Sequence, residues 1–118
     1  MSEQNNLLSK LVQSLEDIKA DNIVVIDVRQ QTSITDYMII CNGRASRHVK
    51  AIAEHIMPIM KSLGMPVLHL SGLETGDWVL VDLGDFVIHI MQPDSRAFYN
   101  LEGLWQDHNE QHDNVSNQ

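Results

Sequence analysis

Hydrophobic positions recur along the chain with two periods, one typical of helices and the other of strands. Apolar residues three and four positions apart, and a proline in the first turn of the last segment, predict helices over residues 6–20, 46–63 and 93–100. Short runs rich in apolar, mostly β-branched residues predict strands over residues 23–28, 37–41, 67–70, 78–83 and 86–91. Helices interleaved with five strands predict an α/β or α+β domain built on one sheet.

Several residues punctuate this pattern. Ser46 is placed as the N-cap of the second helix, and Gly64 as the residue just past its end. Pro58 lies inside that helix and is expected to kink or split it, because proline has no N–H to donate. From residue 106 the chain is polar and without a period, so we expect one folded domain over residues 1–105 and a disordered acidic tail over residues 106–118.

The last two strands predict a hairpin with two unlike faces. Gly84-Asp85 is a two-residue loop with glycine first, which favours a type II′ turn. One face then carries the apolar pairs Leu83–Phe86, Val81–Ile88 and Val79–Ile90. The other face carries the pairs Asp82–Val87, Leu80–His89 and Trp78–Met91. Either a helix covers this mixed face and Trp78 is an ordinary core residue, or the face docks a partner with Trp78 as its aromatic anchor.

Composition sets limits on the class of protein. The chain has 118 residues, of which 43% are hydrophobic and 20% charged, which are ordinary values for one globular domain. No apolar run approaches the length of a membrane span, and the N-terminus lacks the layout of a signal peptide. Cys41 is the one cysteine, so no internal disulfide can form. These features predict a cytoplasmic location.

The net charge of −8 is unevenly distributed. Residues 1–69 carry seven acids and seven bases, whereas residues 70–118 carry nine acids and a single base, Arg96. A nucleic-acid binder needs a basic stripe, and the C-terminal half has the opposite charge. The acidity favours a basic protein partner, although solubility alone also explains it.

Searches for catalytic and metal-binding sets give no convincing result. His108 and His112 have a spacing seen in metal sites, but they lie in the expected disordered tail. Asp82 and Asp85 do not form the convergent carboxylate pair that metal-dependent phosphoryl transfer needs, because Asp85 lies in the turn. Cys41 ends an apolar strand and is expected to be buried. We therefore expect no cofactor and no bound metal, and a binding module rather than an enzyme.

Three sequence blocks resemble the ribosomal silencing factor family, also called Iojap-related. The first block comprises residues 33–43 and 46–49, and the second comprises residues 76–85 and 87–91. The closing block is carried by Arg96, Tyr99, Leu101, Glu102, Leu104 and Trp105. The resemblance covers residues 6–105, and Pro58 is not a feature carried over from the family.

The resemblance implies a five-stranded mixed sheet with flanking helices, like a nucleotidyltransferase core without the catalytic carboxylates. It implies binding to large-subunit ribosomal protein fourteen, which blocks joining of the small subunit and lowers translation in starvation or stationary phase. It also implies association with late large-subunit assembly, and no ligand or cofactor. A nucleotide-binding enzyme, an assembly factor without silencing activity, and a homodimer formed through the hairpin face remain alternatives.

The resemblance and the hairpin pattern together assign candidate contact residues. The partner-binding set is Trp78 as anchor, with Asp77, Asp82, His89, Met91 and Tyr99. Arg47 and His48 match the family pattern. For these two residues, a structural role at the start of the second helix is at least as well supported as a contact with a partner. A basic patch of Arg44, Arg47 and Lys50 is a candidate for a minor contact with ribosomal RNA.

Overall fold

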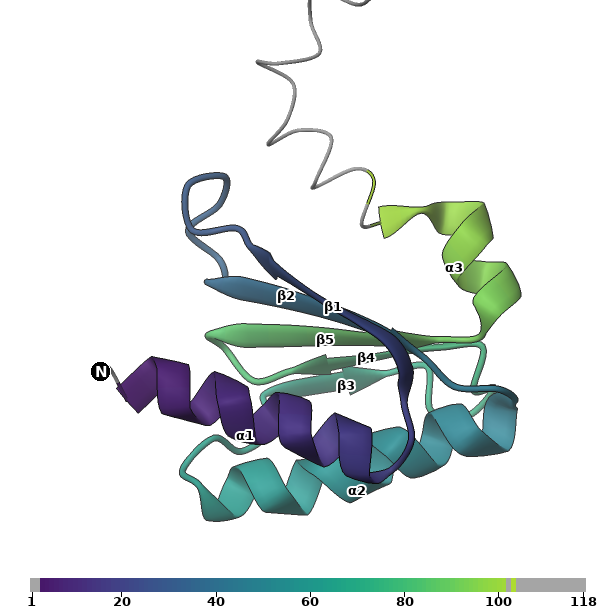
Figure 1. Cartoon of the computed structure of the whole chain (residues 1–118), viewed down its shortest axis with the longest axis horizontal. Helices are drawn as coiled ribbons and strands as arrows, with labels where there is room; N and C mark the ends of the chain where they lie inside the picture. The colour runs from purple at the N-terminus through teal and green to yellow at the C-terminus, as the bar shows by residue number, and fades with distance from the viewer. Residues whose placement is uncertain (1–2, 102, 104–118) are drawn as a thin grey trace, which may run out of the picture.

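The computed structural model describes residues 3–101 and residue 103 (Figure 1). The elements are α1 (Glu3–Asp17), β1 (Asp21–Asp27), β2 (Tyr37–Asn42), α2 (Ser46–Ser62), β3 (His69–Ser71), β4 (Trp78–Asp82), β5 (Phe86–Met91) and α3 (Pro93–Tyr99). All eight expected elements are present, with ends that differ from the expected ones by up to three residues. The expected tail over residues 106–118 lies outside the described residues.

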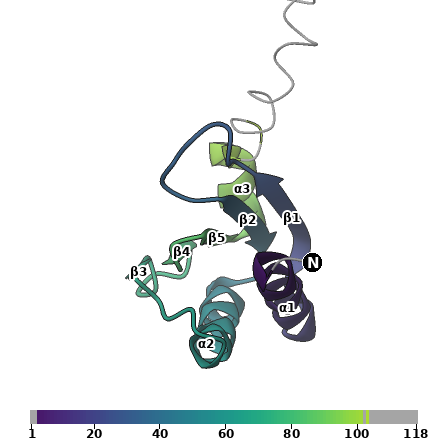
Figure 2. The ribbon, with the colours of Figure 1, turned by 90° about the vertical axis from the view of Figure 1, so that its left-hand side faces the viewer.

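The strands form one mixed sheet in the order β1-β2-β5-β4-β3. β2 and β5 are parallel, and the other neighbouring pairs are antiparallel. This arrangement confirms the expected five-stranded mixed sheet. Helices α1 and α2 cover one face, while α3 lies on the opposite face near the end of β5 (Figures 1 and 2).

The main core lies between the sheet and the two long helices. Alternate strand residues such as Ile39, Phe86 and Ile88 are fully buried against helix residues such as Leu11 and Ile52. A second, smaller cluster lies on the opposite face of the sheet. It comprises Ile26, Val28, Met38, Ile40 and Met91, with Val24, Trp78 and Leu101 packed against it. This second face is therefore partly closed, and it contains the mixed face of the hairpin.

Helix α2 differs from the sequence-based expectation at its N-cap and at Pro58. Its N-cap is Ala45, in extended backbone and without a side-chain hydrogen bond, so Ser46 is the first helical residue and not the cap. Pro58 does not split the helix, which runs unbroken through it to Ser62. At the other end, Gly64 adopts φ +88° directly after the C-cap, as expected. The Met65 N–H donates to the carbonyl of Met60, which completes the helix end.

His48 joins α2 to the end of α1. Its Nδ1 accepts a hydrogen bond from the Arg44 N–H at 3.0 Å, so Nε2 carries the proton and donates to the carbonyl of Ile18 at 2.9 Å. The structural role considered for His48 is thus confirmed. Arg47, by contrast, is exposed.

We expect His48→Ala to lower the free energy of unfolding by about 1–2 kcal/mol, because two backbone groups lose their partner. Arg47→Ala, one residue away and exposed, is the matched control and should change stability by less than about 0.5 kcal/mol. Urea unfolding of the two variants measures this difference. Equal losses in both variants would contradict the role given to His48.

Candidate docking face

The hairpin forms with the expected two-residue loop and register. The Leu83 N–H donates to the carbonyl of Phe86 at 2.8 Å, and Gly84 has φ +96°. Val81 pairs with Ile88 and Val79 with Ile90 on the face toward α2, where all four side chains are fully buried. The opposite face carries the expected pairs of Trp78 with Met91, Leu80 with His89 and Asp82 with Val87.

Trp78 is the centre of an aromatic group on this second face. Its Nε1 donates a hydrogen bond to Nδ1 of His89 at 2.9 Å, and the two ring centroids are 5.7 Å apart. The Tyr99 ring, from α3, lies 4.7 Å from Trp78, centroid to centroid. Trp78 is half-buried and Tyr99 is 52% exposed. The helix thus covers Trp78 only in part, and the pair presents an aromatic surface to solvent.

Two of the six candidate contact residues lie beneath this surface. His89 is 6% exposed and Met91 is fully buried, so neither is available for direct contact in this conformation. The expectation of direct contact from these two residues is therefore corrected. Both lie on β5, where neighbouring strands and the aromatic group cover them. They support Trp78 from below, His89 through its hydrogen bond and Met91 through the register of the hairpin.

Two residues to which the sequence assigned no role hold α3 and the loop before β4 in place. Arg96 is 5% exposed and donates from Nη1 to the carbonyl of Asn22 at 2.6 Å and to Oδ1 of Asn42 at 2.9 Å. Gln92 donates from Nε2 to the carbonyl of Gly76 and to Oδ1 of Asp77, both at 3.1 Å. Arg96 therefore fixes the helix that carries Tyr99. Its place in the closing sequence block was the only signal for it.

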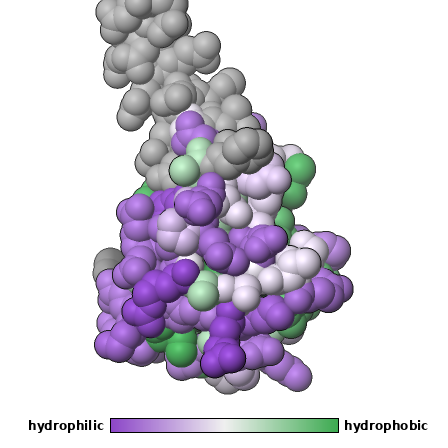
Figure 3. Space-filling model, turned by 90° about the vertical axis from the view of Figure 1, so that its right-hand side faces the viewer, coloured by the Kyte–Doolittle hydropathy of each residue, from purple (hydrophilic) through white to green (hydrophobic). Residues whose placement is uncertain are grey.

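The rim of the face is acidic. Asp77 is exposed, and Asp82 is half-buried with Oδ1 accepting a hydrogen bond from the Gly84 N–H at 2.8 Å. From residue 69 to residue 95 the sequence has five carboxylates and no lysine or arginine. The end of the molecule at which α3 lies is predominantly hydrophilic, with small apolar spots (Figure 3). A partner must therefore match an aromatic pair with a carboxylate at each end of β4, Asp77 beside Trp78 and Asp82 at the far end.

The reactive side chains and the hollows of the described residues are the places where catalysis or metal binding would occur. Burial raises the pKa of the Cys41 thiol to about 12, so its reactive thiolate is strongly disfavoured. Among the described side chains, no three His, Cys, Asp or Glu residues gather so as to hold a metal ion. Of two open hollows, one of about 470 Å³ is lined by residues 70–74 and includes the Glu74 carboxylate, and one of about 410 Å³ is lined by Met57, Pro58, Lys61, Pro66 and Val67.

The burial of His89 predicts a pH-dependent stability. Burial lowers the pKa of His89 to about 4, from about 6.5 in the unfolded chain. Between pH 4 and pH 6.5 the unfolded state binds more protons than the folded state. The contribution of His89 to the free energy of unfolding is therefore complete above pH 6.5 and falls as the pH drops toward 4. We expect a loss of about 1.4 kcal/mol per pH unit in this window from this group.

His89→Gln removes the titrating group and keeps an acceptor for the indole N–H, so this slope should be absent in that variant. His69→Gln removes an exposed histidine from the edge strand β3 of the same sheet and is the matched control. Urea unfolding at pH 7, 6, 5 and 4.5 gives the slopes. An unchanged slope in His89→Gln would show that His89 does not control this pH dependence.

Comparisons with known proteins were consistent across sequence and structure. The family model described as "Ribosomal silencing factor during starvation" matches residues 1–118. A Haemophilus influenzae protein named ribosomal silencing factor RsfS is 44% identical over 99 residues, covering 84% of this chain and 97% of the relative. A mouse protein named mitochondrial assembly of ribosomal large subunit protein 1 is 36% identical over 83% of this chain and 44% of its own length.

Solved structures share the fold. A crystal structure of a Chromobacterium violaceum protein superposes with a TM-score of 0.84 at 38% identity, covering 90% of this chain and 88% of that one. Within the described part of the chain, no helix is long and apolar enough to cross a membrane.

Proposed function

Because the chain belongs to the ribosomal silencing factor family, we propose that it binds the large ribosomal subunit and silences translation by preventing the small subunit from joining. The observation that carries the proposal is the contact of the half-buried Trp78 with the exposed Tyr99, on a face with Asp77 and Asp82 at the two ends of β4. An aromatic anchor with charges around it is the usual centre of a protein interface. The protein acts in the cytoplasm, without chemistry and without a cofactor.

The partner on the large subunit is ribosomal protein fourteen. Ribosomal proteins are generally basic, and the acidic stretch from residue 69 to residue 95 favours approach to such a surface. Negative charge repels the phosphates of ribosomal RNA, so direct RNA contact is at most minor and falls to the separate patch of Arg44, Arg47 and Lys50.

Each residue of the face has a distinct task. Trp78 is the anchor, and Tyr99 extends the aromatic surface from α3. Asp77 and Asp82 pair with lysine or arginine side chains of the partner, and as rim charges they mainly set the on-rate and the salt dependence. His89 and Met91 support the anchor from beneath.

The mechanism is steric exclusion. The bound domain occupies the surface through which the large subunit would meet the small subunit, so the two subunits cannot join. Its effect follows mass action, and each 1.4 kcal/mol of affinity changes the ratio of bound to free subunits about tenfold.

The experiment is a subunit-joining assay. Purified large and small subunits are mixed with increasing protein and separated on sucrose gradients. The proposal expects joined ribosomes to decrease with concentration, less strongly at high salt. Unchanged joining at saturating protein, with the protein still on the large subunit, contradicts silencing but not binding.

A second role is favoured by one comparison. The mouse relative is named for assembly of the ribosomal large subunit. An assembly role uses the same binding face and predicts an accumulation of large-subunit precursors when the protein is depleted. Gradient profiles of depleted cells during rapid growth, when silencing is not required, separate this role from silencing.

A further inference from the structure

The most exposed large hydrophobic side chains lie away from the aromatic pair. Among the described residues, Ile34 is 84% exposed and Leu68 is 68% exposed, more than Tyr99 or Val25. Ile34 lies in the connection between β1 and β2, and Leu68 directly precedes β3. Neither contributes to the two cores. Both are candidates for contact with another molecule.

The turn of the hairpin lies between the residue that precedes β3, Leu68, and the end of the segment that carries Ile34. On one side, the Leu68 N–H donates to the carbonyl of Asp82 at 2.8 Å, and a Cβ added to Gly84 would lie 3.3 Å from Cδ1 of Leu68. On the other side, the carbonyl of Asp85 accepts hydrogen bonds from the N–H groups of Asp36 and Tyr37, both at 3.0 Å. Residues 28–36, β3 and the turn thus meet at one end of the sheet, opposite α3 (Figures 1 and 2).

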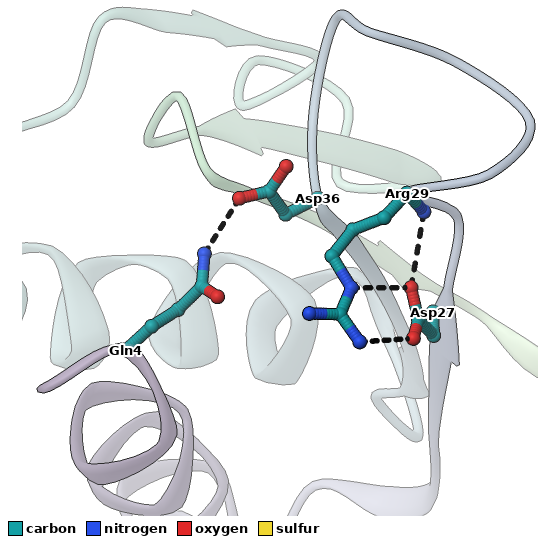
Figure 4. A network of polar contacts seen from close by, with 4 residues as sticks. All are labelled: Gln4, Asp27, Arg29 and Asp36. Atoms are coloured by element: carbon teal, nitrogen blue, oxygen red, sulfur yellow. Dashed lines mark hydrogen bonds and ion pairs between the residues drawn. The ribbon is translucent and has the colours of Figure 1, made fainter. Parts of the chain in front are cut away.

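The segment that carries Ile34 is fastened at both ends. Arg29 donates from Nε and Nη2 to the two carboxylate oxygens of Asp27 at 2.9 and 2.7 Å, and Gln4 donates to Asp36 at 2.6 Å (Figure 4). The Val28 N–H donates to the carbonyl of Asp36 at 3.0 Å, which closes the loop. The two ends of the loop are therefore fixed by hydrogen bonds, and Ile34 between them is exposed to solvent.

The charge around the two hydrophobic residues selects the kind of partner. Asp36 and Asp82 are half-buried and Asp85 is exposed, and the nearby Arg29 is already engaged by Asp27. These carboxylates repel a phosphate backbone and attract lysine and arginine. Apolar contacts inside an acidic rim fit a basic protein surface that offers apolar side chains.

We propose that Ile34, Leu68 and the Gly84-Asp85 turn form a second contact, here the sheet-end surface, with a basic protein of the large subunit. The inference rests on the proposed function. It extends the contact surface of the domain from the aromatic pair along the whole of β4. Trp78 and Asp82 mark the two ends of that strand, about 13 Å apart at 3.3 Å per residue. A patch of about 800 Å² per partner, usual for a specific complex, is wide enough to include both ends.

The test compares the affinities of variants for isolated large subunits by co-sedimentation. The double variant Ile34→Ser with Leu68→Ser removes both apolar side chains from exposed positions. We expect it to bind about tenfold more weakly than wild type. Val25→Ser is the matched control, because Val25 is an exposed valine of β1 on the face toward α1, and it should bind as wild type does. Circular dichroism checks that all three proteins are folded.

Equal affinity of wild type and the double variant overturns the sheet-end surface and leaves the proposed function intact. Failure of wild type to bind large subunits overturns the proposed function, and this inference with it. A photo-crosslinking residue in place of Ile34 identifies the neighbour. An adduct with a basic ribosomal protein supports the inference, whereas adducts only with ribosomal RNA or with a second copy of this chain contradict it.

Discussion

Trp78→Ala should weaken binding to the large subunit at least thirtyfold, about 2 kcal/mol, the loss typical of an interface anchor. The indole is half-buried, packs against the Tyr99 ring and donates to His89, so its removal takes away the centre of the aromatic surface. It also leaves the buried His89 without its donor. Co-sedimentation with isolated large subunits at several salt concentrations measures the loss, and circular dichroism checks the fold.

Trp78→Phe is the informative companion variant. It keeps a ring against Tyr99 but cannot donate to His89, so we expect an affinity between those of wild type and Trp78→Ala. Asp77→Asn, at the rim, should instead reduce the salt dependence and the on-rate with a smaller change in affinity. Wild-type binding by a folded Trp78→Ala variant would place the contact elsewhere on the domain.

Arg96→Met should lower the free energy of unfolding by about 2–4 kcal/mol, because the hydrogen bonds of a buried charged group are among the stronger ones. The guanidinium joins α3 to the carbonyl of Asn22 and the side chain of Asn42, from β1 and β2. Methionine fills much of the same volume but donates no hydrogen bond. Without this link, Tyr99 is no longer held against Trp78, so binding to large subunits should weaken as well.

Urea unfolding and co-sedimentation of the same protein test the two consequences of Arg96→Met separately. Arg96→Lys keeps the charge and one donor, and it should fall between Arg96→Met and wild type in both measurements. A variant that is less stable but binds normally would show that the position of α3 does not matter for docking. Unchanged stability would contradict the anchoring role itself.

The local elements could be predicted because they depend on residues close together in the sequence. The hairpin is the clearest case: a glycine-first loop fixed the register, and the register assigned each side chain from Trp78 to Met91 to its face. Ala45 rather than Ser46 became the N-cap because the position of the first helical turn depends on how the preceding backbone leaves β2. Boundaries of this kind are set by tertiary packing.

The docking face could be predicted only in part, because burial is a property of the assembled sheet. His89 and Met91 share a face with Trp78, and alternation alone cannot show that they lie beneath the aromatic pair and the flanking strands. The contact of Tyr99 with Trp78 and the bonds of Arg96 to β1 and β2 join residues far apart in the sequence. Likewise, the segments that carry Ile34 and Leu68 are far apart in the sequence, and only folding places both beside the turn of the hairpin.

We propose that the acidic face of this domain docks on ribosomal protein fourteen of the large subunit. A competition experiment checks this contact: the protein is sedimented with isolated large subunits in the presence of increasing amounts of purified protein fourteen. We expect free protein fourteen to remove the domain from the subunits, and Trp78→Ala not to bind the competitor. Undiminished sedimentation of the wild-type protein at a large excess of properly folded protein fourteen would show that the domain docks elsewhere on the subunit.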